Sequence, residues 1–154
     1  MSSSSSGKKK MRKIFLVNGP NLNLLGTREP DVYGSITLRQ IEQMLKGEAR
    51  KRGVKIAFYQ SNHEGSIIDV IQRLPAKGFS GLIINPGAFT HYSYAIRDAI
   101  KATGLPTVEV HLSDIMKREE FRKTSVTREV CIDQVKGLGP QGYVKAIEIL
   151  LTSQ

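Results

Sequence analysis

The chain has 154 residues, of which 40% are hydrophobic and 24% are charged, and its formal net charge is +9 at pH 7. These values indicate one globular domain with a sizeable core. They exclude a membrane protein, because no apolar run approaches the ~18 residues of a spanning helix. Cys131 is the single cysteine, so the sequence excludes an internal disulfide and a cysteine-rich zinc site, and we expect a cytoplasmic protein. The positive charge suits an anionic small molecule, weak nucleic-acid binding or simply a basic solvated surface.

The first ten residues read MSSSSSGKKK and contain no apolar segment. This composition predicts disorder and does not match a secretory signal. We therefore expect residues 1–10 to form a disordered tail, as an added tag would, with Met11 as the natural start. Residues 11–154 are expected to form a single domain.

Short apolar runs alternate with helical patterns along the rest of the chain. The expected strands lie at 14–17, 54–58, 81–85, 106–111 and 130–135. The expected helices, marked by apolar residues at helical spacing, lie at 38–52, 67–74, 92–103, 113–121 and 143–151. Thr37 and Gln40 have capping-box spacing before the first helix. Five strand–helix repeats predict a parallel sheet with helices on both faces, in the flavodoxin-like order 2-1-3-4-5.

In such a fold, ligands bind beyond the carboxyl ends of the strands, where strands 1 and 3 diverge. His91 follows the third expected strand, and Glu109 and His111 lie at the end of the fourth. Because Glu109 and His111 are two residues apart on a strand, their side chains share a face, and the carboxylate can orient and charge the imidazole. The alternative is a core histidine bonded to the backbone.

The loop after the first strand, NGPNLNLLGTREPDVYG (18–34), is long for a strand-to-helix connection. It lacks the Gly-Lys-Ser/Thr ending of a phosphate-binding loop. Arg28 and Tyr33 are compatible with a lid that folds over a ligand. Its Asn, Gly and Pro residues are equally compatible with a purely structural loop.

Other motifs carry weaker signals. Residues 137–142 match G-x-G-x-x-G, but only twelve residues follow, so a tight turn is favoured over a dinucleotide site. Arg118 and Arg122 share one helix face, where surface ion pairs are an equal alternative. The histidines show no metal-ligand spacing, and His63 is expected at the surface. Cys131 is expected to be buried in the last strand. No lysine ends a strand at the switch point, so no carrier for a Schiff base is evident.

Taken in order, several motifs resemble type II 3-dehydroquinate dehydratases. They are NGPNLNLLGTREPDVYG, INPGAFTHYS, RDA, EVHLS, REEFR and GLGPQGY, and together they span nearly the whole chain from Met11 onward. The resemblance implies a flavodoxin-like fold and the conversion of 3-dehydroquinate to 3-dehydroshikimate without metal or cofactor. It also implies a small anionic substrate, no nucleic-acid or membrane partner, and a dodecamer built from trimers.

The resemblance also implies catalytic roles. Tyr33 matches the base that removes the proton α to the ketone. Lowering its pKa from about 10 to near 7 takes roughly 3 units, and the nearby Arg28 favours the phenolate. Asn21 matches the residue that holds a water against the enolate oxygen. His111 matches the general acid for the departing hydroxide, with Glu109 keeping it oriented and protonated.

Further positions match groups that bind the substrate's hydroxyls and carboxylate: Asn85, His91, the backbone of Leu112, Ser113 and Arg122. Asp98 matches an acidic residue that reaches a neighbouring subunit's site, although its own surroundings in the sequence indicate an ordinary helix surface. Tyr92 and the polar segment 126–129 depart from the family pattern.

Two alternatives of other classes stay open from the residues alone. One is a flavin- or nucleotide-binding module on the same fold, and the other is a weak nucleic-acid binder. Within the dehydratase interpretation, the sequence leaves open whether the enzyme serves aromatic amino-acid biosynthesis by the shikimate pathway or the breakdown of quinate.

Overall fold

The computed structural model describes residues 12–27, 35–113 and 124–153. Among them, five strands form one parallel sheet in the order β3-β2-β4-β5-β6. The strands are β2 (Arg12–Asn18), β3 (Val54–Gln60), β4 (Gly81–Asn85), β5 (Thr107–His111) and β6 (Asp133–Lys136). Numbered along the chain, this order is 2-1-3-4-5, so the predicted flavodoxin-like α/β class is confirmed.

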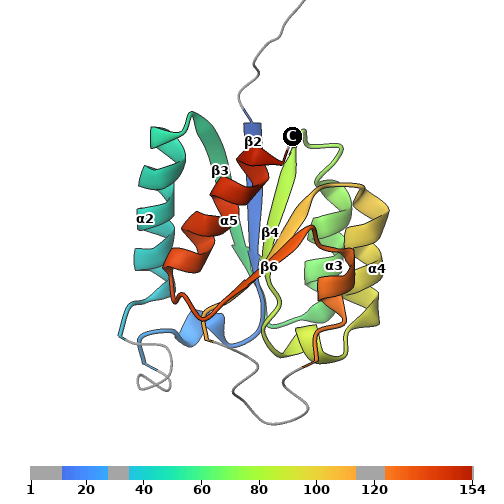
Figure 1. Cartoon of the computed structure of the whole chain (residues 1–154). Helices are drawn as coiled ribbons and strands as arrows, with labels where there is room; N and C mark the ends of the chain where they lie inside the picture. The colour runs from blue at the N-terminus through green and yellow to red at the C-terminus, as the bar shows by residue number, and fades with distance from the viewer. Residues whose placement is uncertain (1–11, 28–34, 114–123, 154) are drawn as a thin grey trace, which may run out of the picture.

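Helices cover both faces of the sheet, giving three layers (Figure 1). One face carries α2 (Leu38–Lys51) and α5 (Gln141–Thr152), and the other carries α3 (Glu64–Arg73) and α4 (Tyr94–Thr103). Each helix pair buries its own apolar cluster against the sheet. Strands β4 and β5 are buried at every residue, which explains why they read as continuous runs rather than as alternating patterns.

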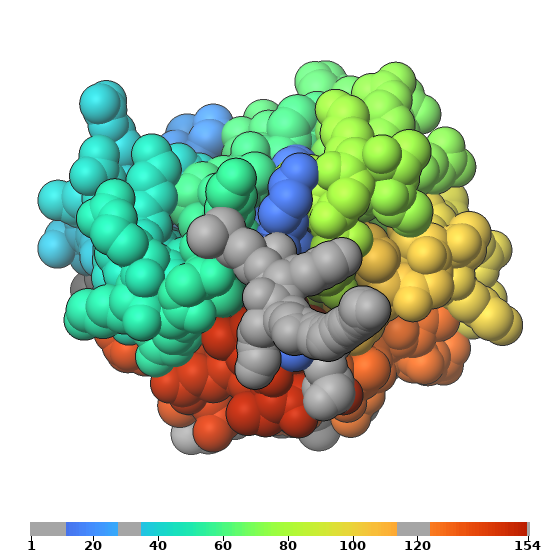
Figure 2. Space-filling model, turned by 90° about the horizontal axis from the view of Figure 1, so that it is seen from above, coloured from blue at the N-terminus to red at the C-terminus, as the bar shows by residue number. Residues whose placement is uncertain are grey.

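The first strand of the sheet lies in its middle. Viewed along the strands, the start of β2 is flanked on both sides by later parts of the chain (Figure 2). It pairs with β3 on one side and with β4 on the other. From β2 the sheet extends to β3 on one side and to β4, β5 and β6 on the other. The carboxyl end of β2 is therefore the switch point at which the ligand was predicted to bind.

Local signals in the sequence form as expected at α2. Gln40 donates its backbone N–H to Thr37 Oγ1 (3.1 Å), and Thr37 donates its own to Gln40 Oε1 (2.9 Å), so the capping box is complete. Gly104 ends α4 with φ 69°, a left-handed conformation that a side chain disfavours.

The last strand begins later than predicted. Val130, predicted as its first residue, instead ends the short 3-10 helix η5 (Thr127–Val130), and pairing with β5 begins only at Asp133. The apolar residues that suggested a strand serve other purposes: Val130 packs on the α3–α4 cluster and Ile132 is 47% exposed. Cys131 is accordingly half-buried outside the strand, and its thiol donates to Thr127 O at 3.3 Å. The helix predicted at 113–121 lies outside the described residues.

Candidate active site

Glu109 and His111 form a buried pair at the carboxyl end of β5. Their side chains point to one face of the strand, and His111 Nε2 donates to Glu109 Oε2 at 2.6 Å. Glu109 is fully buried and His111 is 6% exposed. The histidine therefore bonds a carboxylate, not the backbone partner that the alternative interpretation supposed.

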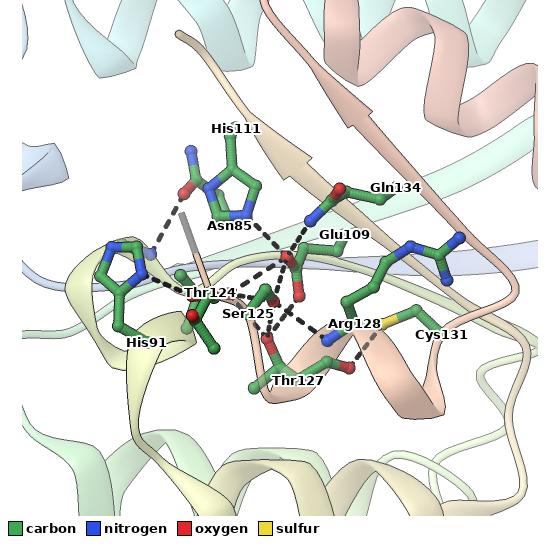
Figure 3. A network of polar contacts seen from close by, with 12 residues as sticks. Asn85, His91, Glu109, His111, Thr124, Ser125, Thr127, Arg128, Cys131 and Gln134 are labelled. Carbon is green, nitrogen blue, oxygen red and sulfur yellow. Dashed lines mark hydrogen bonds and ion pairs between the residues drawn. The ribbon is translucent and has the colours of Figure 1, made fainter. Parts of the chain in front are cut away.

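The carboxylate of Glu109 accepts further hydrogen bonds from residues of other segments (Figure 3). Ser125 and Gln134 donate at 2.7 and 2.8 Å, Thr90 lies at 3.1 Å, and Thr127 donates to the second carboxylate oxygen. A buried charge is tolerated only when it is paired and hydrogen-bonded, and both conditions hold here.

Two opposing effects act on the pKa of Glu109. Burial alone would raise it, but the hydrogen bond and charge of His111, together with the bonds from Thr127 and Gln134, outweigh burial and lower the pKa to about 2. Glu109 is thus an anion at neutral pH, and it accepts a hydrogen bond from the imidazole of His111. The Glu109–His111 pair can therefore act as a general acid, which donates a proton to a departing group.

A second buried polar group joins the ends of β2 and β4 to α5. Tyr143, fully buried, donates its hydroxyl to Asn18 Oδ1 (2.5 Å) and accepts from Asn85 Nδ2 (3.0 Å). Asn85 Oδ1 in turn accepts from the backbone of Gly87 at 3.2 Å. Burial raises the pKa of Tyr143 well above its usual range, against a smaller lowering by the Asn85 bond, so the hydroxyl stays protonated. Sequence reasoning missed Asn18 and Tyr143, although both lie within the motifs quoted above.

The loop after β2 starts in close contact with the end of β4. A Cβ on Gly19 would lie 2.5 Å from Pro86 O, so no side chain fits there. Asn21 adopts φ 70°, the one positive φ of a non-glycine among the described residues, and its N–H donates to Asn62 Oδ1 at 3.0 Å. Asn21 is exposed at this edge of the sheet. Arg28 and Tyr33 lie outside the described residues.

The predicted substrate-binding residues are only partly gathered here. His91, at the end of the 3-10 helix η2 (Gly87–His91), holds Thr124 O with Nδ1 at 2.7 Å, and a carbonyl only accepts, so Nδ1 carries the hydrogen. Leu112 and Ser113 follow β5 directly, and the Leu112 carbonyl accepts from Gly139 at 3.0 Å. Arg122 lies outside the described residues.

Asp98 lies apart from the Glu109 group. It is exposed on α4 and pairs with Arg97 at 3.1 Å, while Arg97 also reaches Glu129 at 3.0 Å. Nothing in this ion-pair network contacts His111 or Glu109. On one copy of the chain, Asp98 is therefore a surface residue, as its sequence context indicated.

The residues that the structure describes contain no group of three or more His, Cys, Asp or Glu side chains that could hold a metal ion. No helix within them has the length and apolar content needed to cross a membrane.

A flavodoxin-like sheet with a buried Glu–His pair and buried amides at its carboxyl edge defines a class of protein: an α/β protein with a site for acid–base chemistry on a small ligand. Comparison with known proteins gives the family. The model of the family "Dehydroquinase class II" matches residues 12–151. The 3-dehydroquinate dehydratase of Thermotoga neapolitana is 55% identical over 136 residues, covering 88% of this chain and 92% of the relative.

Solved structures agree with this assignment. The type II dehydroquinase of Butyrivibrio crossotus superposes with a TM-score of 0.91 at 46% identity, covering 92% of this chain and 99% of that one. That of Propionibacterium acnes gives a TM-score of 0.88 at 36% identity, covering 94% and 99%. The chain belongs to the type II dehydroquinase family, the 3-dehydroquinate dehydratases, whose reaction is the dehydration of 3-dehydroquinate. The comparisons give no support to the flavin- or nucleotide-binding alternative.

Proposed function

We propose that this chain performs its family's reaction as a trans-elimination, converting 3-dehydroquinate to 3-dehydroshikimate through an enolate. The observation that carries the proposal is the buried Glu109–His111 pair at the carboxyl end of β5, beside β4, with its 2.6 Å contact. The substrate is a β-hydroxy ketone with a carboxylate. Its dehydration needs a base, stabilisation of the enolate oxygen and an acid for the departing hydroxide.

Two of these roles are assigned from the resemblance to the family. Tyr33 is the base that takes the proton α to the ketone, and Arg28, five residues earlier, favours its phenolate form. Both residues lie outside the described structure. Asn21 is described, and its exposed position in the loop after β2 suits a side chain that holds a water against the enolate oxygen.

The acid is His111. A charged imidazolium can release its proton to the departing hydroxyl, and the ionised Glu109 compensates the positive charge before that step. The bond to Glu109 uses Nε2, so we assign proton delivery to Nδ1. The pair also explains how a charged histidine is tolerated at 6% exposure.

The remaining predicted residues bind the substrate. Asn85, His91, the backbone of Leu112, Ser113 and Arg122 contact its hydroxyls and carboxylate. Asp98, exposed on α4, would serve a neighbouring subunit's site, in line with a dodecamer of trimers. We further propose that residues 11–154 form one dehydroquinase domain, that residues 1–10 are a disordered tail, and that the protein works in the cytoplasm without metal or cofactor.

The test is direct, because the product is a conjugated enone whose absorbance can be followed on adding 3-dehydroquinate. Sedimentation of the same sample measures its oligomeric state, and a monomeric protein would refute the proposed dodecamer. Tyr33→Phe should abolish turnover while the oligomer and melting temperature stay unchanged. An unaltered kcat in that variant would remove Tyr33 as the base, and intact protein without any activity would refute the proposed function.

A further inference from the structure

The carboxylate of Glu109 receives its donors from three parts of the chain. Thr90 belongs to η2, Ser125 and Thr127 lie just before or in η5, and Gln134 belongs to β6. Three of the four are neutral hydroxyls, and all four contact the carboxylate as described above.

These donors also hold one another in place. Thr90 Oγ1 lies 2.6 Å from Ser125 Oγ and 2.9 Å from Thr127 Oγ1. The backbone of Val126 donates to Thr90 O at 2.7 Å, which ties the two segments together. Three hydroxyls carry three hydrogens, so with Ser125 and Thr127 donating to Glu109, the Thr90 hydroxyl donates to Glu109 Oε2, Ser125 Oγ or Thr127 Oγ1, one acceptor at a time. The network still converges on one buried anion.

The hydrogen-bond network determines whether the proton between Glu109 and His111 resides on the carboxylate or on the imidazole. Without donors, a fully buried carboxylate would tend to take the proton from its neighbour, because burial disfavours the charged form. The pair would then be a neutral glutamic acid beside a neutral imidazole. Hydrogen bonds to the anion favour the alternative state, in which the proton resides on the imidazole and the charge on Glu109.

We propose that Thr90, Ser125, Thr127 and Gln134 are positioning residues for the dehydratase reaction: they keep Glu109 ionised and fixed in orientation, so that the proton of the pair stays on His111. The inference rests on the proposed function, because it assigns these residues a part in supplying the acid. None of them touches the substrate in this account, and each acts through Glu109.

Few titratable groups of the described structure face this carboxylate. His111 shares its strand, and the Cys131 thiol lies beyond η5, its pKa raised to about 12 by burial and then by the charge of Glu109. Lys136 of β6 is opposite His111 in register but exposed. Arg128 contributes its backbone N–H to Ser125 Oγ at 3.1 Å, while its side chain is exposed. The pH response should therefore follow the carboxyl group of Glu109.

The sharpest variant is Thr127→Val, which removes one donor at nearly constant volume. Thr107→Val is the matched control, because Thr107 is fully buried on the same strand as Glu109 but donates to Leu105 O at 3.0 Å. Losing one hydrogen bond to a charged group should lower kcat by roughly tenfold with little change in KM. The acid limb of the pH–rate profile should move to higher pH, because Glu109 with fewer donors protonates more easily. Thr127→Ser should restore both values.

A second measurement does not depend on activity. The melting temperature of the wild type should rise between about pH 2 and about pH 5, the range in which Glu109 is ionised in the folded protein but still protonated in the unfolded chain. This rise should shrink in Thr127→Val but not in Thr107→Val. If both valine variants show the wild-type pH profile and the same rise, the positioning role is refuted while the proposed function stands. If the wild type forms no enone, the proposed function fails, and the melting data still decide whether the donors hold Glu109 ionised. Should Thr127→Val not fold, Ser125→Ala replaces it, with the same outcomes.

Discussion

Tyr143 and Asn18, separated by 125 positions in the sequence, share a hydrogen bond of 2.5 Å in the interior of the protein. The bond ties the last helix to the end of the first strand, where the loop 18–34 begins. Because the same hydroxyl accepts from Asn85, one tyrosine orients two amides at the ends of neighbouring strands. Tyr143, which is fully buried, thus fixes the side chains of Asn18 and Asn85 from the interior of the protein.

Replacing that hydroxyl should affect both stability and substrate binding. In Tyr143→Phe, Asn18 Oδ1 loses its donor and Asn85 Nδ2 loses its acceptor, and buried unsatisfied groups cost about 1–3 kcal/mol. We expect a lower melting temperature and a KM raised several-fold, because Asn85 is no longer fixed. Tyr59→Phe, whose hydroxyl makes no hydrogen bond in the described structure, is the control for thermal melting and kinetics. An unchanged KM in Tyr143→Phe would mean that Asn85 is oriented by other contacts.

Loss of the acid should slow turnover without comparable loss of binding. His111→Ala is expected to reduce kcat by about 10²–10⁴-fold, the usual contribution of general acid catalysis. His63→Ala, at the exposed start of α3, should behave as the wild type in the same steady-state assay. A His111→Ala enzyme of normal kcat would reassign the acid.

Stability should depend on pH through Glu109. Its pKa in the folded protein, about 2, lies below the ordinary value of 4.5, so its ionised form stabilises the fold. That contribution is fully present above ~5 and is lost as the pH falls toward 2. Thermal melting across this range should show a fall on acidification, and Glu109→Gln should flatten it. A fall of equal size in Glu109→Gln would assign the effect to other carboxylates.

The contact between the loop 18–34 and β4 should tolerate no side chain. Gly19→Ala would place Cβ 2.5 Å from Pro86 O, forcing the backbone of the loop to move and displacing Asn21. We expect reduced stability and a clear loss of kcat/KM. Gly47→Ala is the matched control, since its Cβ meets nothing within 4 Å in the middle of α2 and should stabilise by about 0.5–1 kcal/mol. Equal melting temperatures for the two variants would contradict this account.

The sequence alone indicated the strand order and the geometry of Glu109 and His111, because both follow from local periodicity. Residues two apart on a strand must share a face, and apolar runs alternating with helices leave few topologies open. The late start of β6 could not be predicted from periodicity. Val130 and Ile132 are β-branched apolar residues typical of strands, but they precede Asp133, where pairing with β5 begins.

The polar partners were harder to predict for a physical reason. Thr127 and Gln134 contact Glu109 across 18 and 25 positions of sequence, and Tyr143 contacts Asn18 across 125. No local pattern encodes such contacts, because they arise only when strands and helices pack. Ser, Thr and Gln are common enough that their presence near a strand carries no signal until the fold brings them to one carboxylate.

The central claim is that the chain dehydrates 3-dehydroquinate with the Glu109–His111 pair as its acid. The most direct test compares enone formation by the wild type and by Glu109→Gln in the same assembled state, across the pH range in which both remain folded. The account predicts rapid enone formation by the wild type and a strongly reduced kcat in the variant, because a neutral amide cannot support a charged His111. Equal rates for the two proteins, or no enone from the intact wild type, would contradict it.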